Sequence, residues 1–133
     1  MGEVFQFDDP VSRAVRYLNG FGLWDVEREE PDGYTYDGVL VLIHDGGGAG
    51  EYSRQLSDTR LTFDVRAGPE RQRDAAEAAS LVDALVRDWS YREGGVYYRG
   101  ALSRPTFSPE ADRRLPAYVW TVNLAFRGRP LSM

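Results

Sequence analysis

The chain has 133 residues, of which 42% are hydrophobic and 28% charged, with a formal net charge of -5 and no cysteine. This length suits a single domain over residues 1–133 with its own hydrophobic core. The acidic balance disfavours a protein that grips nucleic acid by neutralising phosphates, and the lack of cysteine excludes disulfides and thiolate metal sites. Neither a long apolar run nor a basic, then apolar, leader is present, so we expect a cytoplasmic protein that neither spans a membrane nor is secreted.

The first predicted element is a short helix. Residues 1–9 show no helical period and are expected to form a flexible tail or an edge strand. Asp9 suits the N-cap, Pro10 the first helical position and Gly20 the end of the helix. Between them the chain carries apolar residues at spacings of three and four, namely Val11, Ala14, Val15 and Leu18.

The middle of the chain predicts strands separated by loops. Leu23–Glu27 has the length of a short strand, and Glu29–Gly38, with Pro31 and two glycines, indicates a loop. The apolar run Val39–Ile43 is typical of a strand that is central or covered on both sides. Leu61–Arg66 alternates apolar and polar residues, which predicts a strand with one wet face.

The second half predicts a long helix and a hairpin with an extended tip. Glu70–Trp89 carries a helical stripe about 30 Å long. Val96–Ser103 is predicted to pair with Ala117–Arg127, a strand of roughly 36 Å, through the proline-rich connection Arg104–Pro116. Large apolar residues occupy every second position of that last strand: Tyr118, Trp120, Val122, Leu124 and Phe126. The predicted fold is α+β, with a mixed or antiparallel sheet of about four main strands covered by one long and one short helix, and with Trp89 and Trp120 buried between them.

Residues with catalytic or metal-binding chemistry are present but do not form a motif. The glycines of residues 46–50 resemble a phosphate loop in composition only, since no lysine follows them. His44, the only histidine, is either a general base beside Asp45 or a structural residue at a strand end. The clustered carboxylates belong to a helix start and a turn: Asp8, Asp9, Glu27, Glu29 and Glu30. We therefore expect no cofactor, no metal and no enzymatic activity.

The two long connections are predicted to contact partners instead. The first, His44–Arg60, exceeds the usual loop length. Its glycines lose much conformational entropy when fixed, so we expect His44–Asp58 to be mobile or packed on a neighbour until a partner orders it. Its predicted contact residues are Gly46, Gly47, Gly48, Tyr52, Arg54 and Leu56. The second is the hairpin tip, with predicted contact residues Arg104, Phe107, Glu110, Arg113 and Arg114. The adjacent arginines Arg113 and Arg114 suit bidentate contacts to acidic groups on a partner.

The order of these segments resembles a known family. A short N-terminal helix is followed by an apolar strand, a glycine-rich loop and a strand reading DTRLTFDVRA. An alanine-rich helix, the tip RPTFSPEADRRLP and a final strand reading VWTVNLAFRG come after it. Over residues 10–129 this arrangement is similar to the tail terminator, or tail completion, proteins of long-tailed bacteriophages and gene-transfer particles.

The resemblance implies a structural protein of the virion. Such an α+β subunit forms a ring, commonly of six copies, that caps the tail tube at the tail–neck junction and gives the head connector a docking surface. The implied partners are further copies of the chain, the tail tube protein and a head-completion protein, with DNA only as cargo passing through the ring. Assembly would take place in the host cytoplasm, and the isolated protein would be a monomer or weak oligomer. Two alternatives remain: another head–tail connector or minor tail component of similar build, and a small-molecule-binding or hydrolytic domain that uses His44 and the glycine loop.

Overall fold

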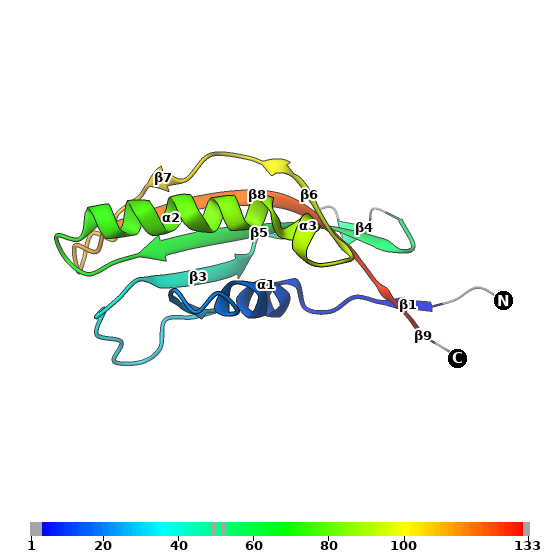
Figure 1. The fold of residues 1–133 in the computed structure, drawn as a ribbon, viewed down its shortest axis with the longest axis horizontal. Coiled ribbons are helices and arrows are strands. Elements are labelled where there is room, and N and C mark those ends of the chain that lie inside the picture. Colours follow the sequence, from blue (N-terminus) through cyan, green and yellow to red (C-terminus); the bar gives the residue numbers. More distant parts are fainter. Residues whose placement is uncertain (1–3, 49, 52, 132–133) are drawn as a thin grey trace.

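The computed structural model describes residues 4–48, 50–51 and 53–131. The fold is α+β, with 24% helix and 38% strand (Figure 1). The main sheet runs in the order β2 (Asp25–Glu27), β3 (Leu40–Asp45), β5 (Leu56–Arg66), β8 (Ala117–Arg127) and β6 (Val96–Ala101). Two short strands extend it, β4 (Gly50–Glu51) beside β5 and β7 (Thr106–Phe107) beside β8. A separate pair joins β1 (Val4–Gln6) to β9 (Arg129–Leu131).

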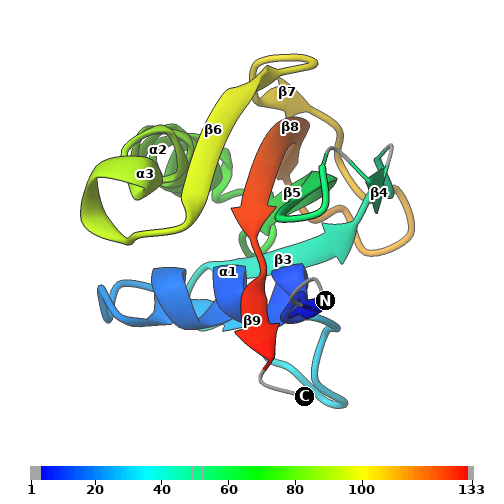
Figure 2. The same ribbon diagram turned by 90° about the vertical axis from the view of Figure 1, so that its right-hand side faces the viewer.

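The helices α1 (Pro10–Asn19), α2 (Gln72–Arg87) and α3 (Trp89–Arg92) cover one face of the sheet (Figures 1 and 2). The predicted start of α1 is confirmed, because the Asp9 carboxylate accepts a hydrogen bond from the Val11 N–H at 3.0 Å. The long predicted helix begins two residues late and ends in a separate turn. Glu70 has a left-handed backbone with a φ of 66°, so the first regular turn waits until Gln72.

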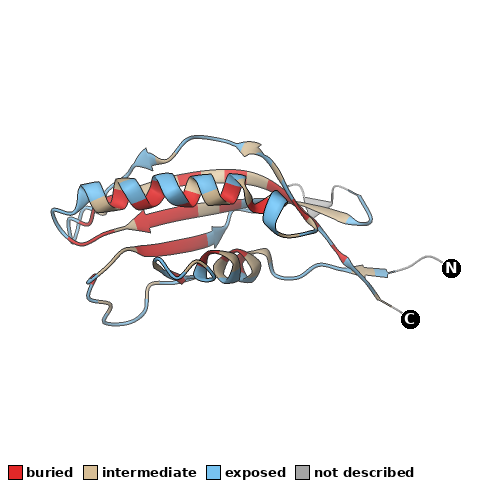
Figure 3. Cartoon of the chain, viewed as in Figure 1, coloured by how far each residue is buried: buried red, intermediate tan, exposed pale blue. Residues whose placement is uncertain are grey.

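The longest strand pairing of the sheet joins β5 to β8. It is antiparallel and joins eleven residue pairs, from Leu56 opposite Arg127 to Arg66 opposite Ala117. The predicted long strand is confirmed with its boundaries, and so is its antiparallel pairing with β6. Figure 3 shows the buried residues concentrated on the central strands and on the inner side of α2. Trp89 and Trp120 are both buried in this core, as predicted.

On the opposite face of the sheet, which is polar at its centre, no helix lies among the described residues. There the hydroxyls of Thr62 and Thr121 lie 2.8 Å apart, and the Arg60 guanidinium donates to the Asn123 amide oxygen at 3.3 Å. A smaller apolar cluster covers one end of this face: Tyr36, Leu40, Leu42 and Leu115. Because β3 contributes residues to both clusters, it is covered on both sides, which is one of the two alternatives predicted for this apolar run.

The prediction that His44–Arg60 forms one long loop is wrong, because both ends of this range belong to strands. His44 and Asp45 belong to β3, and Leu56–Arg60 belongs to β5. The chain between them is hydrogen-bonded to β5 as well, with the Gly46 N–H donating to the Arg60 carbonyl at 2.8 Å and the Arg60 N–H to the Gly47 carbonyl at 2.9 Å. Much of the predicted mobile loop is therefore an extension of the sheet.

The remaining segments divide between strand and loop. Of the two structures considered for residues 1–9, an edge strand forms at Val4–Gln6, and residues 1–3 lie outside the described part. The predicted short strand at Leu23–Glu27 is present as β2, which pairs in parallel with β3. Residues 29–38 form the expected loop.

Candidate functional site

The two predicted contact regions lie at opposite ends of the β5–β8 ladder (Figure 1). We call the chain that leads from Gly46 to the start of β5 the glycine segment. It contains β4 and adjoins the end of the ladder at Leu56 and Arg127, where the β1–β9 pair also lies. The hairpin tip adjoins the other end, at Arg66 and Ala117, beside the start of α2. At about 3.3 Å per residue, eleven residues separate the two regions by roughly 36 Å.

The glycine segment is packed closely against β5. Gly48 has a φ of 118°, and a Cβ added to it would lie 2.7 Å from the backbone oxygen of Asp58. This position therefore requires glycine both for its backbone conformation and for its approach to the neighbouring strand. The Gly47 N–H donates to the Asp45 carboxylate at 2.8 Å, which fixes the turn.

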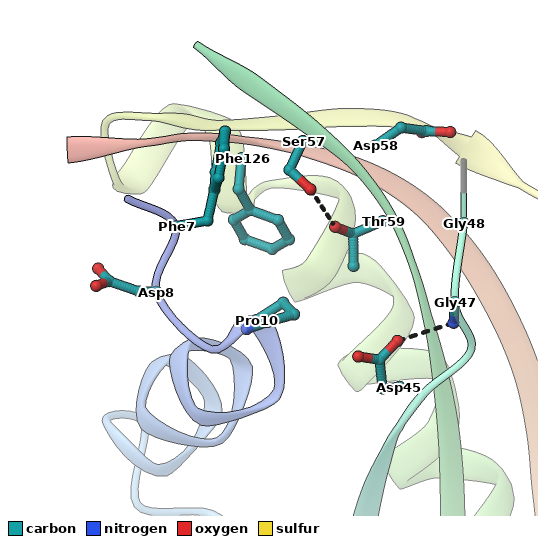
Figure 4. Close-up of a pocket in the computed structure, with 10 residues that line it drawn as sticks. All are labelled: Phe7, Asp8, Pro10, Asp45, Gly47, Gly48, Ser57, Asp58, Thr59 and Phe126. Carbon is teal, nitrogen blue, oxygen red and sulfur yellow. Dashed lines mark hydrogen bonds between the residues drawn. The ribbon is translucent and has the colours of Figure 1, made fainter. Parts of the chain in front are cut away.

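A cavity of about 310 Å³ opens between this segment and the N-terminal strand region (Figure 4). Its lining combines apolar rings with hydroxyl and carboxylate groups: Phe7, Asp8, Pro10, Asp45, Gly47, Gly48, Ser57, Asp58, Thr59 and Phe126. In Figure 4 the Asp8 and Asp58 carboxylates point away from Thr59 and from the Phe126 ring. Asp8 instead forms an ion pair with Arg129 at 3.2 Å. The cavity thus has acidic groups at its mouth and not a converging set of ligands.

The other predicted residues of the glycine segment are only partly placed. Tyr52 lies outside the described residues. The Arg54 guanidinium lies over the Phe5 ring, 5.7 Å from its centre, which ties the segment to β1. Leu56 is half-buried as the first residue of β5.

The pair proposed for general-base chemistry is not assembled. His44 and Asp45 are successive residues of a strand, so their side chains point to opposite faces of the sheet. His44 is exposed, and within the described part of the chain its imidazole makes no hydrogen bond. Asp45 is engaged with the Gly47 N–H.

The hairpin tip gathers three of its five predicted residues around a second cavity. Phe107, Glu110 and Arg114 line a space of about 410 Å³ together with residues at the start of α2. Phe107 is 44% exposed, and its ring contacts that of Tyr118 at 5.4 Å. Arg104 is exposed and does not line this cavity.

The two arginines of the tip behave differently. The Arg113 fork donates to both carboxylate oxygens of Glu30, at 2.7 and 3.0 Å, and also to Glu110 at 2.9 Å. Its predicted bidentate contact is thus made within the chain. Arg114 is exposed and forms no ion pair among the residues described, so its charge stays available at the surface of the tip.

The loop of residues 29–38 is fastened to the tip by Glu30. The Tyr36 hydroxyl donates to the same carboxylate, and the Arg66 guanidinium lies 3.8 Å from it. The hydrogen bond from Arg113 is the main reason that the pKa of Glu30 lies below its usual value. Burial raises the pKa of Tyr36 to about 12, so its hydroxyl remains a donor at neutral pH.

Sequence reasoning did not find this Glu30 network. Glu30 and Arg113 are 83 positions apart in the sequence, and no periodic pattern connects them. The one available signal was the turn composition around Pro31, Asp32 and Gly33, which marks a compact loop but not its neighbour.

Within the described residues, no group of three or more His, Cys, Asp or Glu side chains could hold a metal ion. In the same part of the chain, no helix is both long and apolar enough to cross a membrane. Comparison with protein-family models gave no match, and no curated protein matches this sequence.

Proposed function

We propose that this protein is a structural subunit that forms a ring at the junction between a phage tail tube and its head connector. The observation that supports this proposal best is the position of the two contact regions at opposite ends of one rigid ladder. A subunit with this shape can present a different surface to a partner on each side.

The rigidity of the ladder comes from its packing. Eleven antiparallel pairs join β5 to β8, and the strands carry buried residues such as Phe63, Leu61 and Trp120 on the helix-covered face. Loops held on such a scaffold keep their relative positions, which is a requirement for a part that sets the spacing between two assemblies.

The end regions also have the composition of contact surfaces. At the tip, a half-exposed phenylalanine, Phe107, and an arginine that has no ion pair among the described residues, Arg114, line one cavity. Aromatic residues and arginine contribute most of the binding energy in typical protein interfaces. DNA enters this proposal only as cargo that passes through the ring, in keeping with the net charge of -5.

The proposal is tested by adding the purified protein to purified tail tubes that lack a terminal ring. Electron microscopy should show a ring, six-fold in projection, at one end of each tube, and tubes with a ring should no longer lengthen. Binding along the sides of the tubes, or no binding, would contradict it. A protein that binds only the isolated head connector would favour the alternative of another head–tail connector component.

The two ends predict separable defects. Arg114→Glu should abolish one of the two docking steps and leave ring formation and the other step intact. A matched charge change at the exposed Arg73 on the outer side of α2 should leave both steps intact. The comparison is made by counting free tails, free heads and complete particles, and a loss of both steps from Arg114→Glu alone would contradict the two-ended arrangement.

The hydrolytic alternative is tested by His44→Ala. Because no partner orients this imidazole in the described structure, we expect the variant to assemble particles as the wild type does.

A further inference from the structure

A groove lined by four arginines contrasts with the acidic character of this chain. It has a volume of about 430 Å³ and lies beside β9, between α1 and the turn that follows α3. Its charged lining consists of Arg13, Arg16, Arg127 and Arg129 with Asp8 and Glu93, and the rest of the lining is glycine and proline. Four cations and two anions give a local charge of +2, while the whole protein carries -5.

Two of these arginines are already neutralised. Arg13 pairs with Glu93 at 2.7 Å, and Arg129 pairs with Asp8 at 3.2 Å. Arg127 donates only to neutral acceptors, of which the Tyr97 hydroxyl at 2.9 Å is the nearer. Arg16 is exposed, and its guanidinium makes no hydrogen bond or ion pair within the described part of the chain.

Residues 27–32, which are the last residue of β2 and the loop after it, have the opposite character, with four carboxylates and one cation, Arg28, that pairs with Asp9. Glu27, Glu29 and Asp32 are exposed, and none of them forms an ion pair among the described residues. We call residues 27–32 the acidic loop. It therefore offers three unpaired carboxylates, and the arginine groove offers two cations without an anionic partner.

The acidic loop is held in place before any partner arrives. Glu30 is fixed by the Arg113 fork, and the Tyr34 hydroxyl donates to the Asp25 carboxylate at 2.7 Å. The Tyr34 N–H closes a turn onto the Pro31 carbonyl at 3.1 Å. A loop ordered in this way loses little conformational entropy on binding, which favours its use as a contact surface.

The carboxylates of the acidic loop do not occupy the groove of their own chain. Among the described residues, none of these carboxylates forms an ion pair with an arginine of the groove. Glu30 is held at the hairpin tip by Arg113, and Arg28 holds the start of the loop to Asp9 and to Ser12 of α1. An anionic partner for the two unpaired groove arginines therefore comes from another molecule, and a second copy of this chain carries a surface of the matching charge.

We propose that the arginine groove of one copy receives the acidic loop of a second copy. This inference rests on the proposed function, because it names the contact by which neighbouring subunits of a ring would meet. The contact joins two different surfaces, so each subunit can engage one neighbour through its groove and another through its loop. Carboxylates and arginine forks also form the strongest charge-assisted hydrogen bonds.

The experiment measures self-association of the full chain by sedimentation velocity at low and at high salt. Arg16→Glu, Glu29→Arg and Arg73→Glu are compared, the last being a matched charge reversal away from the groove. Arg16→Glu and Glu29→Arg should each weaken association by about tenfold or more, while Arg73→Glu should not. Mixing the Arg16→Glu and Glu29→Arg proteins should restore association, because each then supplies one intact surface and the reversed charges complement each other. High salt should weaken the wild-type contact.

The outcomes separate this inference from the proposed function. Rings that form equally well from Arg16→Glu and the wild type would overturn the groove contact and leave the ring proposal standing. Charge-dependent association that ends in a closed dimer would support the contact and count against the ring. No self-association of the wild type at any concentration would overturn the contact. A labelled DNA duplex is included, and Arg16-dependent DNA binding without any Arg16-dependent self-association would also overturn it.

Discussion

Trp120 provides the most direct test of how the core is held together. Its side chain is 1% exposed and stacks on Phe63, with ring centres 5.4 Å apart. Truncation of a large buried aromatic residue to alanine costs about 3–5 kcal/mol. We expect Trp120→Ala to reach the upper half of that range, because the indole fills the space between the central ladder and the helices and the stacked contact is lost as well.

Trp120→Phe should be much milder, for two reasons that the structure supplies. The phenyl ring retains the stacked contact with Phe63. The Trp120 Nε1 is buried, and the described residues offer it no hydrogen-bond acceptor. A buried donor without a partner costs about 1–3 kcal/mol, so its removal offsets part of the lost volume. We expect Trp120→Phe to lower the free energy of unfolding by less than about 2 kcal/mol.

The measurement is urea unfolding followed by far-ultraviolet circular dichroism, since tryptophan fluorescence would change with the residue itself. The dependence of the unfolding free energy on urea should stay similar in all variants if only stability changes. A loss below about 1 kcal/mol for Trp120→Ala would refute the position of Trp120 in the core. Equal losses for Trp120→Ala and Trp120→Phe would show that neither the stacking nor the unpartnered indole N–H matters.

Two further predictions concern the glycine segment and the Glu30 network. Gly48→Ala should destabilise the protein by about 1–3 kcal/mol, because the added Cβ would lie 2.7 Å from the backbone oxygen of Asp58, whereas Gly47→Ala meets no atom within 4 Å and should cost less. Equal urea midpoints for the two variants would contradict the close packing of the segment. The pKa of Glu30 is lowered in the folded state, so its contribution to stability is complete above its unfolded pKa near 4.5 and is lost as the pH falls through the lower folded value. Glu30→Gln should therefore reduce the loss of stability on acidification below about pH 4.5, as measured by urea unfolding across pH, and an unchanged acid profile would contradict this assignment.

The elements that sequence alone predicted are those with strong periodicity or a clear cap. The strict alternation from Tyr118 to Phe126 defined β8, and Asp9 with Pro10 defined the start of α1. Both signals are local, because each follows from a few neighbouring side chains and the geometry of one element.

The extension of β5 toward Leu56 was not predictable in the same way. Leu56–Arg60 contains one apolar residue followed by Ser57, Asp58 and Thr59, which resembles a loop. The strand forms there because β8 continues to Arg127 and supplies hydrogen-bonding partners along its whole length. Pairing with a distant strand overrides local composition in such cases.

The candidate contact surfaces depended even more on long-range placement. The tip cavity joins Phe107 and Arg114 to the start of α2, and the arginine groove joins α1 to β9. The individual residue types were visible in the sequence, but their grouping followed from the crossing of chain segments. This is why Arg113 was predicted to bind a partner and is instead engaged by Glu30.

The β5–β8 ladder has a mechanical consequence for a molecule attached at both ends. Its hydrogen bonds run perpendicular to the strands, and its eleven pairs extend from one contact region to the other. A tension applied between those regions, along the strand axis, loads the bonds in shear, so they share the force and must fail together. A force on one edge strand, directed along the hydrogen bonds, would instead break these bonds one after another. The protein should therefore resist stretching along its long axis far better than peeling from its side, which single-molecule pulling from the two directions would measure.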